Sequence, residues 1–165
     1  MRSQTTWTGL MVLTVALSGC ASARFYPVQG PLSTQKPVPV LKGTISGPFF
    51  SGSMRVKMPG GEMCTGHWER VQHDAGQTAR PQDARATAEM ADLWNNLYGH
   101  NFYQDKVKGS LMYSRGVLTG TAGTTIDVEF YQAPVDARDP VRERVEAIMG
   151  VGKDNKGNAY KISLL

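Results

Sequence analysis

Few side chains in this sequence are chemically reactive. They are most concentrated around Cys64 and His67, with His73 nearby. A thiolate beside an imidazole can act as a nucleophile or hold a transition metal. Cys64 and His67 are three positions apart, however, and such positions on a strand point to opposite faces. A structural zinc site also needs four ligands. We therefore predict a buried, inert Cys64 and no metal site, with Cys64, His67 and His73 as weak candidates only.

Two carboxylates and one further histidine are the other candidates for catalysis. Asp127 and Glu129 alternate with apolar residues and share one face of an expected strand, where carboxylate pairs are commonly solvated. Such a pair does acid–base chemistry only when its environment separates the two pKa values. His100 lies in an aromatic-rich segment, which favours a loop anchored to the core over a catalytic site. The sequence thus predicts no catalytic residue and no cofactor.

The other cysteine ends an apolar run near the N-terminus, in the segment Leu17-Ser18-Gly19-Cys20. Arg2 is the only charged residue before it, and the apolar stretch over residues 10–17 is far shorter than the about 20 residues that span a bilayer. The segment resembles the lipobox of bacterial lipoproteins, Leu-(Ser/Ala)-(Gly/Ala)-Cys. This resemblance implies that residues 1–19 are a cleaved signal peptide and that the Cys20 thiol carries diacylglycerol.

The resemblance also implies a location in the cell. The new amine of Cys20 is usually acylated too, with chains such as palmitate, and two or more chains give a lasting anchor. Ala21 stands where lipoproteins retained at the inner membrane usually have Asp. The implied location is therefore the outer membrane, facing the periplasm, with the lipid bilayer as partner through acylated Cys20. A plain signal peptide with an accidental cysteine is the alternative.

The net charge and the number of cysteines exclude some classes of protein. The formal net charge is +4, and because Arg2 is the only charge before Cys20, residues 20–165 carry +3. So small a surplus, without a basic run interleaved with aromatics, does not indicate nucleic-acid binding. With Cys20 lipidated, Cys64 stands alone, which excludes a disulfide scaffold unless Cys64 pairs with another chain.

Proline and glycine divide the mature chain into two parts. Pro27, Pro31, Pro37 and Pro39 fall within residues 20–40, which we expect to be an extended tether after the lipidated cysteine. Residues 41–165 are one domain's worth of chain and alternate short apolar segments with glycine clusters. We therefore predict a single β-rich domain over residues 41–165.

Periodicity predicts the elements of this domain. Alternating apolar residues on both sides of turns near Gly60, Gly123 and Asn155 indicate three hairpins. A spacing of three and four over residues 90–97, followed by Gly99, predicts a helix over residues 82–98. Residues 139–149 fit either a helix or a strand. We expect a strand from Val145, because the final strand needs a hairpin partner.

The resulting fold class is mainly β: an antiparallel sandwich or small barrel of about seven short strands with one inserted helix. Tyr113, Tyr131 and Tyr160 either form an exposed docking strip on neighbouring strands or are covered by the helix.

For function we expect a non-catalytic interaction or structural module at the cell envelope, with an envelope protein or a glycan as partner. The alternative is a small-ligand carrier or an enzyme with an unrecognised site. A deep pocket near His100, or one lined by His67 and Glu69, would favour that alternative.

Overall fold

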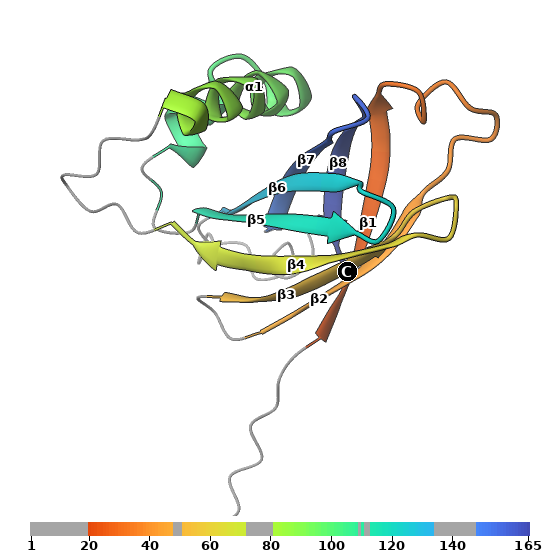
Figure 1. Cartoon of the computed structure of the whole chain (residues 1–165). Helices are drawn as coiled ribbons and strands as arrows, with labels where there is room; N and C mark the ends of the chain where they lie inside the picture. The colour runs from red at the N-terminus through yellow and green to blue at the C-terminus, as the bar shows by residue number, and fades with distance from the viewer. Residues whose placement is uncertain (1–19, 48–50, 72–80, 109, 111–112, 134–147) are drawn as a thin grey trace, which may run out of the picture.

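The computed structural model describes residues 20–47, 51–71, 81–108, 110, 113–133 and 148–165, with the side chains of the helix described from residue 88 onward. Over these residues, eight antiparallel strands form a closed barrel in which each strand pairs with the next in sequence and the last pairs with the first (Figure 1). The strands are β1 (Cys20–Gln29), β2 (Leu41–Ser46), β3 (Ser51–Lys57), β4 (Met63–Arg70), β5 (Tyr113–Gly120), β6 (Thr125–Gln132), β7 (Ile148–Asp154) and β8 (Ala159–Leu164).

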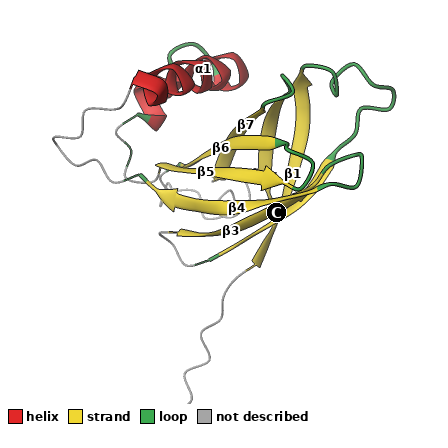
Figure 2. Cartoon of the chain, viewed as in Figure 1, coloured by secondary structure: helices red, strands yellow, loops and turns green. Residues whose placement is uncertain are grey.

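A helix, α1 (Pro81–Tyr98), and a short π-helical turn, η1 (Tyr103–Val107), follow β4 and precede β5 in the sequence. Figure 2 shows α1 outside the barrel. The mainly β fold with one inserted helix is confirmed, and of the two architectures expected, the barrel is the one observed. Within the described part of the chain, no helix has the length and apolar character needed to cross a membrane.

The expected tether over residues 20–40 is wrong for its first half, because residues 20–29 form β1. This strand pairs with β2 on one side and with β8 on the other, and Phe25 is fully buried inside the barrel. Ala23 and Phe25 point inward while Ser22 and Arg24 are exposed, which is the period of two that marks a strand. Pro27 lies where the register with β8 shifts, a position that tolerates a residue without a backbone N–H.

The interior of the barrel is filled by side chains, as expected for an eight-stranded barrel. Phe25 meets Tyr160 edge-on with ring centroids 5.9 Å apart. On β7 the inward position 150 is a glycine, against which the Phe130 ring lies. The buried interior residues are Ala23, Phe25, Leu41, Ile45, Met54, Val56, Met58, Cys64, Leu118, Ile126, Val128, Phe130, Tyr160 and Ile162.

The helix covers part of the outside of the barrel and forms a second core there. This core holds Met90, Leu93, Trp94, Tyr103, Val107, Tyr113, Tyr131, Val151 and Ala159, from α1, η1 and strands β5 to β8. Tyr113 and Tyr131 therefore lie in the core that includes α1 residues, whereas Tyr160 belongs to the barrel interior. The three tyrosines do not form an exposed strip.

The hairpin turns and the strand that begins near residue 148 lie close to where the sequence periodicity predicted them. The predicted turns contain glycines in the left-handed region, with φ of 84° at Gly61, Gly123 and Gly157. The strand expected from Val145 is observed from Ile148; Val145 itself lies outside the described residues.

Glycine at inward position 66 of β4 allows a close approach of the neighbouring strand. A Cβ atom there would lie 1.9 Å from the Val117 carbonyl oxygen, whereas a Cβ at Gly60 would meet nothing within 4 Å. We expect Gly66→Ala to lower the free energy of unfolding by about 1–3 kcal/mol or more, as overpacking does. Gly60→Ala is the matched control and should change it little. Urea unfolding of the two variants measures the difference, and equal stabilities would show that the close approach is not a constraint.

Candidate functional site

The structure separates Cys64 from His67. The Cys64 side chain is fully buried inside the barrel, whereas His67 is exposed on the outside. Burial raises the pKa of the Cys64 thiol and keeps it from pairing with another chain. His73 lies outside the described residues. Within the described segments, no three His, Cys, Asp or Glu side chains converge as metal ligands.

His100 lies in an exposed loop that is anchored by its neighbours. It follows Gly99, whose φ is 119°. The Phe102 ring stacks on Trp94 with centroids 5.9 Å apart, and the Asn95 side-chain oxygen accepts a 3.0 Å hydrogen bond from the Tyr103 backbone N–H. The surroundings of His100 thus hold the loop on the second core.

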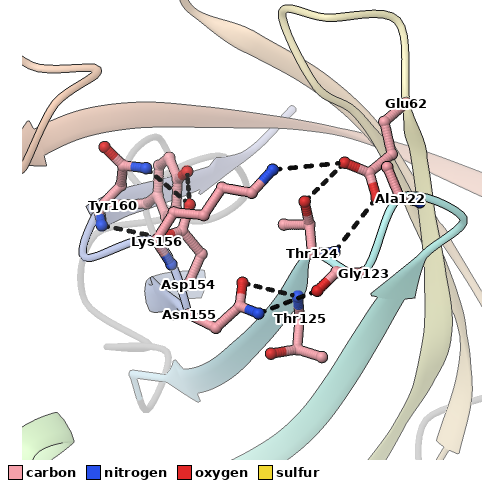
Figure 3. A network of polar contacts seen from close by, with 10 residues as sticks. Glu62, Ala122, Gly123, Thr124, Thr125, Asp154, Asn155, Lys156 and Tyr160 are labelled. Atoms are coloured by element: carbon pink, nitrogen blue, oxygen red, sulfur yellow. Dashed lines mark hydrogen bonds and ion pairs between the residues drawn. The ribbon is translucent and has the colours of Figure 1, made fainter.

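A polar network joins the hairpin turns at one end of the barrel (Figure 3). Glu62, in the β3–β4 turn, accepts hydrogen bonds from the Thr124 hydroxyl at 2.6 Å and from the Ala122 backbone N–H at 2.8 Å, both in the β5–β6 turn. The Lys156 ammonium, in the β7–β8 turn, lies 3.7 Å from the same carboxylate. Three hairpins are therefore tied together through one side chain.

The same network has a second carboxylate, Asp154, which is buried. It accepts hydrogen bonds from the Tyr160 hydroxyl at 2.6 Å and from the Asn158 backbone N–H at 2.8 Å. The Asn158 side chain in turn accepts the Leu32 backbone N–H of the β1–β2 connection at 2.8 Å. Because these carboxylates are engaged within the protein, we interpret the network as a brace that closes the barrel end, and not as a binding site.

The brace predicts sensitivity to acid. Hydrogen bonding, first of all from the Thr124 hydroxyl, lowers the pKa of Glu62 below its ordinary 4.5. The carboxylate therefore contributes stability above that value, and this stability is lost as the pH falls through the lower folded-state pKa. Glu62→Gln should be less stable than the wild type at neutral pH, and the difference should shrink in acid. Urea unfolding at a series of pH values measures it, with exposed Asp105→Asn as control; a difference independent of pH would contradict the brace.

A concave site on the described surface is a groove of about 770 Å³ on the outside of β4, β5 and β6, beside α1. Two cross-strand rows form its floor, because the registers align Glu69 with Arg115 and Glu129, and His67 with Val117 and Asp127. Its further polar side chains and its helical edge are Ser51, Thr65, Thr119 and Met90.

Glu129 is the buried carboxyl of the groove. The expectation that Asp127 and Glu129 are both solvated is wrong for Glu129, which is 6% exposed. It accepts hydrogen bonds from the Trp94 indole N–H at 2.7 Å and from the Tyr113 hydroxyl at 2.6 Å. Asp127 remains exposed. The strand pattern could not reveal this difference, because the covering helix comes from a distant part of the chain.

Burial under the helix raises the pKa of Glu129, against the opposing effect of its hydrogen bonds to Tyr113 and Trp94. A carboxyl with a raised pKa in a concave site is a candidate for function. Each of its oxygens, however, already accepts one of the two hydrogen bonds that join it to α1 and β5. We therefore interpret Glu129 as a residue that holds α1 on the barrel. The exposed ionisable side chains of the groove are His67, Glu69, Arg115 and Asp127.

No protein-family model, curated protein or solved structure matches this chain. Its function is inferred from its residues and their geometry.

The buried Glu129 predicts a pH effect opposite in sign to that of Glu62. Because its pKa is raised above 4.5, the folded state binds the proton more tightly than the unfolded state does. Stability is therefore fully present below the unfolded-state pKa and declines as the pH rises through the folded-state pKa. We expect the wild type to lose stability relative to Glu129→Gln over this range, by about 1.4 kcal/mol for each pH unit between the two pKa values.

Urea unfolding of both proteins at a series of pH values measures this difference. Glu69→Gln, at an exposed position in the same cross-strand row, serves as the control. A constant difference between wild type and Glu129→Gln across the series would show that Glu129 does not titrate in the folded state as its burial requires.

Proposed function

We propose that this protein is an envelope lipoprotein, anchored through Cys20, whose barrel serves as a non-catalytic binding module. The lipobox-like segment before Cys20 carries the proposal of an anchor. The position of Cys20 is compatible with it, because this residue is exposed at the start of β1. Acyl chains on this thiol would extend directly from the barrel wall. The outer membrane, facing the periplasm, remains the proposed location.

The groove on the outside of the barrel supports a binding role. Its walls present hydrogen-bond donors and acceptors of both charge signs, with exposed Val117 between them. This mixture suits a polar partner, such as a glycan or a segment of another envelope protein. The barrel interior is filled by its own side chains, so we place binding on the outside surface.

A small-ligand carrier is the second candidate, and one observation favours it. The groove is lined by His67 and Glu69, which is the arrangement expected for a ligand site. An enzyme has weaker support, because the buried carboxyl of the groove is already engaged by Trp94 and Tyr113.

The anchor is tested by replacing its thiol. In the native organism, Cys20→Ser should move the protein from the membrane to the soluble fraction or leave its leader uncleaved, because acylation needs the sulfur. Fractionation and mass spectrometry of the wild type should show a lipid-modified chain that begins at Cys20. Ser22→Ala, an exposed position on the same strand, is the control and should stay at the membrane. An unacylated wild type would remove the proposed anchor.

The groove is tested by photocrosslinking in intact cells. A photoreactive residue at Val117, in the groove, should capture a specific partner, whereas one at Val40 should not; these two valines are 53% and 45% exposed. When Glu69→Ala and Arg115→Ala are introduced into the protein that carries the photoreactive residue at position 117, the crosslinked product should be lost, because both side chains line the groove. Identical products from both positions, or a product indifferent to the two alanines, would contradict binding in the groove.

A further inference from the structure

We propose that the outer face of β1, β2 and β3 docks on the anionic headgroups of a lipid bilayer, so that the barrel lies side-on against the membrane. We name this surface the basic face and define it by Arg24, Lys42, Arg55 and Lys57. The proposal rests on the proposed anchor for the identity of the membrane, but the charge pattern that carries it is independent of acylation.

The basic face is uniformly cationic. Its four charged side chains are all exposed. The outward positions between them carry serine, threonine and tyrosine, and among the described residues of these three strands there is no carboxylate. The carboxylates nearest in the strand register are Glu69, which pairs with Ser51 where β3 begins, and Glu62, which lies in the turn after β3 and is engaged by Thr124, Ala122 and Lys156. Four cations on one face exceed the +3 carried by residues 20–165, so the rest of the mature chain is slightly acidic.

The cations are placed where they repel one another. Arg24 and Lys42 are directly opposite across β1 and β2, an arrangement of like charges that destabilises a sheet. Lys42 and Lys57 flank the paired residues Gly43 and Val56. Among the described residues no carboxylate forms an ion pair with any of the four. An anionic surface outside the protein would relieve this repulsion.

The anchor position favours a membrane over a soluble polyanion. Cys20 and Arg24 lie on the same strand and, at even positions, on the same outward side. Four residues of a strand span about 13 Å. Acyl chains attached to Cys20 and inserted in the bilayer would therefore hold Arg24 within reach of the headgroups. Acyl chains combined with a basic patch form the usual two-part signal for stable membrane attachment.

Side-on docking would leave the groove accessible. The groove lies on β4, β5 and β6 beside α1 and reaches β3 at Ser51 and Gly52, at the opposite end of that strand from Lys57. Figure 1 shows α1 above these strands and β2 and β3 below them. The barrel would then have one face for the membrane and another for a partner.

The test uses the mature chain, residues 20–165, carrying a synthetic anchor. An alkyl maleimide should modify exposed Cys20 and not the buried Cys64. A single chain of about 14 carbons gives only marginal, reversible membrane binding by itself, so the contribution of the basic face becomes measurable. We expect stronger partitioning into phosphatidylglycerol vesicles than into phosphatidylcholine vesicles, with the preference lost as salt is raised toward about 0.5 M.

Variants that remove charge test whether the preference for phosphatidylglycerol vesicles comes from the basic face. Lys42→Gln with Lys57→Gln should lower partitioning into phosphatidylglycerol vesicles by about 30-fold and leave phosphatidylcholine binding unchanged. Lys106→Gln with Lys108→Gln removes the same charge at exposed positions of η1 and its C-terminal end, and should have a much smaller effect. Circular dichroism checks that both variants keep the barrel.

Three results would overturn the proposal: no preference for phosphatidylglycerol, equal losses from the two pairs of substitutions, or binding of a soluble anionic polysaccharide through the basic face without binding to vesicles. Because the chain is attached chemically, these results are independent of whether the cell acylates Cys20. Mass spectrometry of the native protein decides that separate question.

Discussion

The pairing of β1 with β8 is the interaction on which the rest of the structure depends. It joins the first and last described segments of the chain and converts a row of hairpins into a barrel without free edges. The contact between Phe25 and Tyr160 lies inside this seam. Because β1 begins at Cys20, closure also places the proposed lipid attachment in the barrel wall, and not at the end of a long tether.

The outer surface of the closed barrel has two different faces. On one side, Trp94 and Tyr113 hold the Glu129 carboxylate, and this contact joins α1 to the barrel. The groove lies beside this contact and has Met90 of α1 at its edge. On the other side, β1, β2 and β3 carry only cations among their charged outward residues. A single closed sheet thus presents a mixed polar groove and a basic face in different directions.

Much of the fold was predictable because its signals are local. The alternation around Gly123 and Asn155 and the spacing of Met90, Leu93 and Trp94 identified hairpins and helix. Residues 20–29 were misread because four prolines over residues 20–40 dominate the composition, although Ala23 and Phe25 alternate as a strand requires. Most of these prolines lie in the connection after β1, where they interrupt no ladder.

The sequence by itself determined which side chains share a face of each strand, where the helix lies, and that Cys64 and His67 point apart. Only the tertiary structure decided which of those faces is covered. A period of two makes Asp127 and Glu129 equivalent, but a helix that precedes them by about thirty residues buries only one of the pair. The same holds for the groove and the basic face: strand closure sets which outward rows become neighbours, and long-range pairing of this kind leaves no local trace in the chain.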